Sequence, residues 1–108
     1  MKFISTGLEG AYIIDVEPII DERGFFARSW CADELKAQGL VHNLMQCSIS
    51  FNEKRGTLRG MHYQAAPFEE TKIVRCTSGV IYDVILDLRP ESVTFKDWIS
   101  VELSADNR

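Results

Sequence analysis

Hydrophobic and polar residues alternate over short stretches along most of the chain, which is the pattern of half-buried β-strands. Between residues 10 and 20 the alternation centres on Tyr12, Ile14 and Val16, and a charged turn at 21–24 leads into a second apolar run at 25–30. Further strand-like runs occupy residues 44–51, 56–64, 71–77, 80–88 and 98–103. Because short strands at this spacing are typical of closed or stacked sheets, the pattern predicts a sandwich or barrel of antiparallel strands.

One stretch has the composition of a helix. Residues 31–39 contain helix-compatible residues from Asp33 to Gln38, and Gly39 is suited to end the helix after about two turns. No repeat, low-complexity tract or linker interrupts the chain, so we expect a single domain over residues 1–108. Residues 105–108 read as a turn that leads to another strand, which predicts a fold that is incomplete at its C-terminal end.

Composition narrows the class of protein. The 108 residues are 45% hydrophobic and 26% charged, as in globular domains. No run approaches the roughly 20 apolar residues of a membrane span, and the first residues lack the apolar stretch of a secretion signal. We therefore expect a cytoplasmic protein without a membrane partner. Three cysteines without CxxC spacing predict reduced thiols, with Cys47 and Cys76 buried as small hydrophobic side chains.

The charge balance bears on the partner. A net charge of −4 argues against nucleic-acid binding, which needs a basic face for phosphate contacts. The cations nevertheless gather in the middle of the chain, at Arg23, Arg28, Arg55, Arg59, Lys72 and Arg75. An acidic protein with a local basic pocket is compatible with a small phosphorylated ligand.

Candidate chemistry lies at His62, which the strand-like run 56–64 carries, and at Lys72, ten residues later. A base and a cation on neighbouring strands are what proton abstraction next to a carbonyl requires, because the base takes the proton and the cation stabilises the enolate. A hydrogen-bonded structural histidine is the alternative. Other polar residues in or beside the apolar runs need partners or a cavity unless one face of the sheet is wet; they are Gln46, Ser48, Ser50, Gln64 and Arg75.

Several motifs carry a resemblance to a known family. They are Asp-Glu-Arg-Gly-Phe-Phe at 21–26, residues 46–50, Arg-Gly-Met-His-Tyr-Gln at 59–64 with a lysine ten residues after the histidine, and residues 83–89. Over nearly the whole chain the sequence resembles the N-terminal part of dTDP-4-dehydrorhamnose 3,5-epimerases of the cupin superfamily. The resemblance implies an all-β cupin-type jelly-roll barrel, a homodimer or higher homo-oligomer, a nucleotide-linked 4-keto sugar as the small-molecule partner, and no cofactor.

The resemblance also implies roles for individual residues. His62 corresponds to the base that removes the C3 or C5 proton, and Lys72 to the group that stabilises the 4-enolate. The positions that match nucleotide-sugar contacts are Arg23, Phe26, Gln46, Ser48 and Arg59. Arginines suit a diphosphate because they are planar, permanently charged donors. Core packing is the alternative for Phe26, and surface salt bridges are the alternative for the two arginines.

A metal site is disfavoured on separate grounds. Cupin metal sites use a Gly-x5-His-x-His pattern followed by Glu, and here Gly56, His62 and Glu69 keep that spacing while Gln64 replaces the second histidine. Because Gln is a poor ligand for first-row metals, we expect no metal. A weak site formed by His62, Gln64 and Glu69, in a metal-dependent cupin, is the alternative.

The match has departures that bear on function. Ser48 stands where the family often has Asn, and Arg28 where an acid is common, which implies a different sugar or epimerisation at one carbon. The family's catalytic Tyr and the Asp that orients the histidine fall beyond residue 108; Tyr63 and Tyr82 do not match, and Asp83 is a candidate partner of Lys72. The leading hypothesis is an epimerase of a dTDP-4-keto-6-deoxyhexose in deoxysugar biosynthesis. The alternative is a non-catalytic cupin fragment that binds a sugar nucleotide or self-associates.

Overall fold

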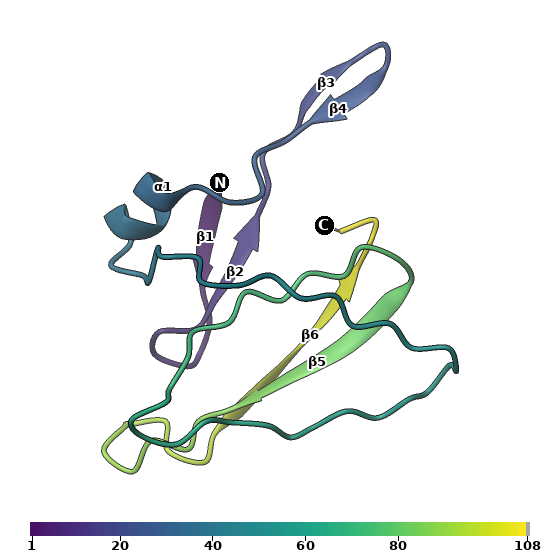
Figure 1. The fold of residues 1–108 in the computed structure, drawn as a ribbon. Helices are drawn as coiled ribbons and strands as arrows, with labels where there is room; N and C mark the ends of the chain where they lie inside the picture. Colours follow the sequence, from purple (N-terminus) through teal and green to yellow (C-terminus); the bar gives the residue numbers. More distant parts are fainter. Residues whose placement is uncertain (108) are drawn as a thin grey trace.

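The computed structural model describes residues 1–107. Within that range it contains six strands and one short helix, so the predicted all-β class with one helix is confirmed (Figure 1). The elements are β1 (Lys2–Ser5), β2 (Tyr12–Asp15), β3 (Ile19–Asp21), β4 (Gly24–Phe26), α1 (Ala32–Ala37), β5 (Val80–Leu86) and β6 (Trp98–Ser104). They form three antiparallel pairs, β1–β2, β3–β4 and β5–β6.

The first pair, β1–β2, runs in register from Lys2 opposite Asp15 to Ser5 opposite Tyr12. Thr6 closes the connecting loop, since its backbone N–H donates to the Ala11 carbonyl at 3.2 Å and its hydroxyl donates to the same oxygen at 2.9 Å. Leu8, inside this loop, is buried. The loop is therefore held by hydrogen bonds and by one apolar side chain.

The second pair, β3–β4, is a short hairpin that projects from the rest of the molecule (Figure 1). Its turn places Gly24 at a φ of 134°, which side-chain-bearing residues rarely adopt. Its apolar residues are open to solvent, with Ile20 78% exposed and Phe26 73% exposed. Core packing, the alternative role considered for Phe26, is therefore not observed in this chain.

Helix α1 confirms the predicted helix and its predicted end. Gly39 adopts a φ of 70°, its N–H donates to the Lys36 carbonyl, and the N–H of Leu40 donates to the Leu35 carbonyl. These two bonds form a Schellman motif, in which a glycine in the left-handed region ends a helix. The helix buries Leu35, which is 2% exposed.

The third pair, β5–β6, is the longest, with seven residue pairs from Val80 opposite Ser104 to Leu86 opposite Trp98. Asp87 organises the loop between the strands, because its buried carboxylate accepts hydrogen bonds from Arg89, Ser92 and Thr94. The hydrogen bonds from Arg89, followed by that from Ser92, hold the pKa of Asp87 far below its usual range. Arg89 also donates to the Glu9 carbonyl at 2.8 Å, which ties this loop to the β1–β2 loop.

Residues 40–79 differ from the prediction. The expected strands at 44–51, 56–64 and 71–77 are absent, and these segments form a long irregular excursion, drawn in teal and green in Figure 1. A strand forms only where a neighbouring strand satisfies its backbone groups. In the part of the chain that the structure covers, no strand pairs with these segments. The sequence pattern was that of strands, but the partners are missing.

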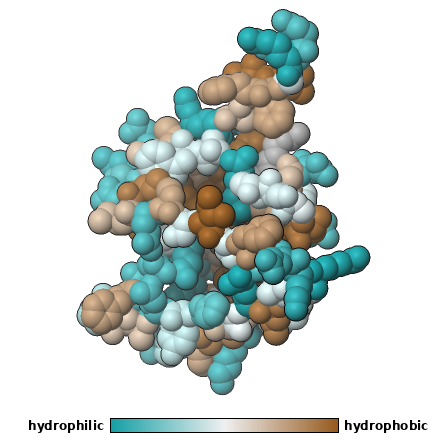
Figure 2. Space-filling model, turned by 45° about the vertical axis from the view of Figure 1, so that its right-hand side comes forward, coloured by the Kyte–Doolittle hydropathy of each residue, from teal (hydrophilic) through white to brown (hydrophobic). Residues whose placement is uncertain are grey.

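The buried core is small for the same reason. Leu8, Leu35 and Cys76 are its buried apolar residues, so the prediction of a buried thiol is confirmed for Cys76 and wrong for Cys47, which is exposed. Hydrophobic surface is visible in Figure 2, including on the part that projects at the top. Between residues 1 and 107 there is no helix long and apolar enough to cross a membrane.

Candidate functional site

A cavity of about 610 Å³ lies between the β1–β2 pair, the end of helix α1, strand β5 and the excursion. The excursion contributes residues 59–64 and 69–74, and β5 contributes Asp83 to Leu86. Tyr12, Ile14 and Leu35 add apolar side chains to the lining. A concave site with apolar lining and a few polar groups is the usual form of a small-molecule site.

Three of the predicted site residues meet in this cavity. Arg59, His62 and Lys72 all line it, although the segments that carry them are irregular rather than the neighbouring strands that we expected. Among residues 1–107 the His62 imidazole has no hydrogen-bond partner, in side chains or backbone. The bond that would mark the alternative, a hydrogen-bonded structural histidine, is therefore not present among the described residues.

Lys72 has a carboxylate partner that the sequence did not suggest. Its Nζ lies 2.9 Å from Glu70 Oε1, whereas Asp83, the candidate partner, lines the same cavity without forming this ion pair. Gln64 belongs to the same group, because its amide nitrogen, when turned toward Glu70, donates to the two carboxylate oxygens at 2.7 and 2.9 Å. The one signal in the sequence was the spacing of Glu70 and Lys72, since residues two apart lie on the same side of an extended chain.

Arg59 is held by neutral partners rather than by the predicted alternative of a salt bridge. Its Nε donates to Asn52 Oδ1 at 2.6 Å, and its Nη2 donates to the Phe51 carbonyl at 3.1 Å. The guanidinium therefore keeps its charge uncompensated by an ion pair within the described residues. A planar cation of this kind suits a phosphate oxygen.

The donor set for a metal is poor. Over the range that the structure describes, no three His, Cys, Asp or Glu side chains are grouped so that they could hold a metal ion. Gln64, in the position of the second histidine, directs its amide nitrogen at Glu70. The amide oxygen, which is the atom of Gln that can bind a metal, is a weaker ligand for first-row metals than the imidazole it replaces.

The remaining predicted contacts lie outside this cavity. Arg23, at the tip of the β3–β4 hairpin, donates from its side chain to the carboxylate of Asp21, which is the salt bridge expected as its alternative role. Its hydrogen bonds lower the pKa of Asp21. Gln46 and Ser48 are exposed on the excursion, and neither lines the cavity.

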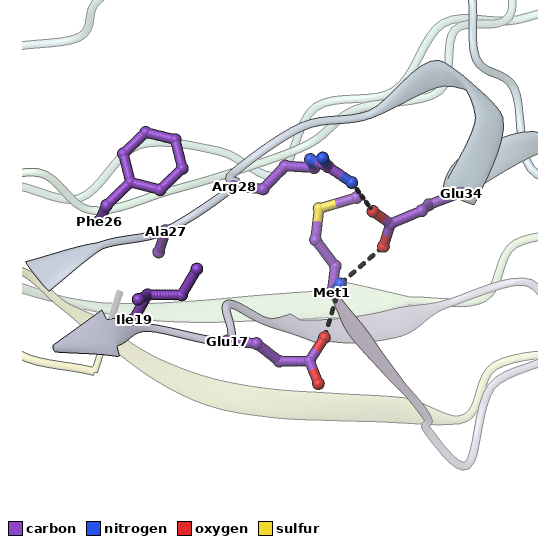
Figure 3. Close-up of a pocket in the computed structure, with 7 residues that line it drawn as sticks. All are labelled: Met1, Glu17, Ile19, Phe26, Ala27, Arg28 and Glu34. Atoms are coloured by element: carbon purple, nitrogen blue, oxygen red, sulfur yellow. Dashed lines mark hydrogen bonds and ion pairs between the residues drawn. The ribbon is translucent and has the colours of Figure 1, made fainter.

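Phe26 lines a second, smaller cavity of about 370 Å³ beside helix α1 (Figure 3). The α-amino group of Met1 lies there between Glu17 at 2.8 Å and Glu34 at 2.6 Å, and Arg28 contacts the other oxygen of Glu34 at 2.6 Å. The bond to the Met1 ammonium, followed by that to Arg28, lowers the pKa of Glu34. Every charge in this cluster has a partner, so Arg28 is a structural cation here.

The chain is similar to known proteins over almost its whole length. The family model for dTDP-4-dehydrorhamnose 3,5-epimerase matches residues 5–108. The dTDP-4-dehydrorhamnose 3,5-epimerase of Escherichia coli is 35% identical over all of this chain and 58% of its own length. The enzyme of the same name from Methanothermobacter thermautotrophicus is 40% identical, over 99% of this chain and 57% of its length.

The solved structures that are similar to this chain are also epimerases. The dTDP-4-dehydrorhamnose 3,5-epimerase of Bacillus anthracis, solved with TDP and PPi bound, has a TM-score of 0.92 and is 40% identical, covering 98% of this chain and 61% of that one. A 4-keto-6-deoxy sugar epimerase from Streptomyces spheroides has a TM-score of 0.89 and is 33% identical, covering 100% of this chain and 54% of that one.

The coverage explains the open architecture. The chain spans 58% of the length of its Escherichia coli relative, while its backbone follows the solved epimerases almost throughout. The predicted fold is thereby confirmed as part of a cupin-type jelly-roll barrel, in which the excursion has the course of the family's backbone without all of its neighbours. From the residues matched and the shared fold, the chain belongs to the dTDP-4-dehydrorhamnose 3,5-epimerase family.

Proposed function

We propose that residues 1–108 form one cupin domain that carries part of the active site of an epimerase acting on a dTDP-linked 4-keto-6-deoxyhexose in deoxysugar biosynthesis. The observation that carries the proposal is the meeting of Arg59, His62 and Lys72 in one cavity. Relatives solved with TDP and PPi, or with dTDP-4-keto-L-rhamnose, support this substrate class.

His62 is the proposed base. It removes the proton at C3 or C5, and the electron pair of the broken C–H bond moves toward the 4-keto group to form an enolate. Lys72 lines the same cavity, and its ammonium is the proposed stabiliser of the negative oxygen, as a fixed cation is at a developing oxyanion. Return of a proton to the opposite face of the carbon inverts it, whereas return from His62 restores the original configuration.

Arg59 is the proposed contact for the diphosphate. Its bonds to Asn52 and Phe51 orient the guanidinium before a ligand arrives. Arg23, Phe26, Gln46 and Ser48 complete the proposed set of nucleotide-sugar contacts. Because they lie outside the cavity of His62 in a single chain, their part in the proposal needs either a change in their position or a second copy of the chain.

Deuterium uptake from solvent into dTDP-4-keto-6-deoxyglucose tests the proposal. We expect exchange at C3 by the wild-type chain, and a loss of at least about 100-fold in His62→Ala, in line with the contribution of a general base. Ser50→Ala, a change outside the proposed site, is the matched control and keeps the exchange. No exchange above that of His62→Ala contradicts the proposal.

The second candidate is a non-catalytic cupin fragment that self-associates or binds a sugar nucleotide. It is favoured by the open apolar surface of the excursion, where Ile49 is 97% exposed and Leu58 is 91% exposed. Surfaces of this kind, next to unpaired backbone, invite association with another chain. Light scattering with and without dTDP tests it, and a stable monomer that ignores dTDP contradicts it.

A further inference from the structure

Three polar side chains, Gln64, Glu70 and Lys72, form a group in the cavity of His62. The proposed chemistry uses only Lys72. Glu70 contacts Lys72 Nζ at 2.9 Å, and the Gln64 amide, in the orientation that places its nitrogen toward Glu70, donates to both oxygens of the same carboxylate. All three residues line the cavity of His62. The sequence brings them together by a turn between them, in which the Phe68 N–H donates to the Ala65 carbonyl at 2.9 Å.

An isolated ion pair at this degree of exposure does not fix a lysine. The side chains of Lys72 and Glu70 are 54% and 37% exposed, and exposed pairs gain little because water competes and two long side chains must be ordered. Gln64 changes this balance, since its bonds to both carboxylate oxygens restrict the rotation of Glu70. Gln64 thereby restrains Glu70, and Glu70 in turn restrains Lys72.

The ion pair with Glu70 leaves Lys72 with N–H donors for a ligand. An ammonium group has three donors, and Glu70 takes one of them. The other donors remain for an oxygen in the cavity. We propose that Glu70 is a positioning residue: its carboxylate, fixed by Gln64, holds the Lys72 ammonium at the cavity wall, where it meets the enolate oxygen. The inference rests on the function proposed above.

The experiment compares Glu70→Gln with the wild-type chain. The substitution keeps the size of the side chain and removes its charge. We expect the kcat of C3 deuterium exchange to fall about tenfold with KM changed less than twofold, because a displaced lysine weakens the stabilisation of the enolate more than the binding of the sugar nucleotide. An unchanged kcat, or a loss confined to KM, overturns the proposal.

A second readout does not depend on turnover. The side-chain NMR signal of Lys72, assigned by its disappearance in Lys72→Arg, should shift in Glu70→Gln. It should stay in place in Glu69→Gln, which removes the same charge from the neighbouring residue. Equal shifts in the two variants, or none in Glu70→Gln, overturn the positioning role.

The two readouts separate this inference from the function on which it rests. If the wild-type chain shows no exchange above His62→Ala, the proposed function fails, and with it the catalytic consequence of Glu70. The Lys72 spectrum then still decides whether Glu70 holds the lysine. If exchange occurs and Glu70→Gln leaves both kcat and the Lys72 signal unchanged, the proposed function stands and the positioning role of Glu70 fails.

Discussion

The β5–β6 pair and the excursion of residues 40–79 have similar alternation of apolar and polar residues, yet only the pair forms strands. Seven residues of β5 face seven of β6 in unbroken register, whereas the excursion has no strand partner among residues 1–107. The difference lies in the neighbours and not in the local sequence. Apolar alternation therefore indicates that a segment is able to form a strand, and the presence of a neighbouring strand decides whether it forms one.

The two regions also divide the proposed roles. The β5–β6 pair is the longest strand pair, while the excursion carries Arg59, His62 and Lys72. The residues proposed for the chemistry thus lie on a segment that has no strand pairing among residues 1–107. We expect the stability of this segment to respond to a ligand or to a covering chain more strongly than that of the β5–β6 pair.

Amide hydrogen exchange gives the largest expected contrast between the two regions. Backbone amides bonded within β5–β6 should exchange orders of magnitude more slowly than those of residues 44–51, because the latter lack ladder hydrogen bonds. Exchange followed by NMR or mass spectrometry measures this directly. Equal protection in both regions contradicts the comparison and indicates that the excursion is paired in solution.

The loop of β5–β6 should lose stability when its organising carboxylate is neutralised. In Asp87→Asn we expect Tm at pH 7 to fall by about 5 °C or more, because the side chain that accepts from Arg89, Ser92 and Thr94 loses its charge. Asp106→Asn, an exposed change of the same kind, is the control. A similar Tm for Asp87→Asn and wild type contradicts the assignment of Asp87.

The same carboxylate sets a pH dependence. The pKa of Asp87 is lowered in the folded chain, so its contribution to stability is complete above its ordinary value of 3.8 and is lost as the pH falls below that value. The Tm difference between the wild type and Asp87→Asn should therefore be constant from pH 5 to 7 and narrow below about pH 4. Thermal unfolding at several pH values measures it, and a difference that widens in acid contradicts the assignment.

The smallest expected difference between the two regions is in the unfolding free energy lost when tyrosines of similar exposure are replaced by phenylalanine. Tyr82 on β5 is 70% exposed and donates to the Ser100 hydroxyl at 2.7 Å, while Tyr63 on the excursion is 74% exposed. Tyr82→Phe should cost about 0.5 kcal/mol of unfolding free energy, since it removes an exposed cross-strand bond. Tyr63→Phe should cost nothing measurable by urea unfolding. A larger loss in Tyr63→Phe would show that the excursion has contacts of its own.

Local signals in the sequence predicted the parts of the fold that depend on local interactions. The helix ends just before Gly39 because a left-handed glycine completes its capping bonds, and β5 and β6 lie close enough in sequence to pair through one loop. The irregular course of residues 40–79 was not predictable in this way. Its cause is the absence of a partner, which alternation within a segment does not report.

The candidate site shows the same division. The family motif at residues 59–64, together with the lysine ten residues after His62, identified Arg59, His62 and Lys72, and the structure brings the three to one cavity. Glu70 was missed because an acid two residues before a lysine is common on any exposed chain. The contact of Met1 with Glu17 and Glu34 was missed because it joins distant positions that no local pattern relates.

The bond from Arg89 to the Glu9 carbonyl bears on the order in which a nascent chain assembles. It joins positions 80 residues apart. Closing a loop of that length costs about 4 kcal/mol in chain entropy, far more than one exposed hydrogen bond returns. During synthesis the β1–β2 hairpin leaves the ribosome long before Arg89 is translated, so its loop must wait in solvent. The N-terminal hairpin is thus able to form early in synthesis, whereas its hydrogen bond to Arg89 forms only after residue 89 has been translated.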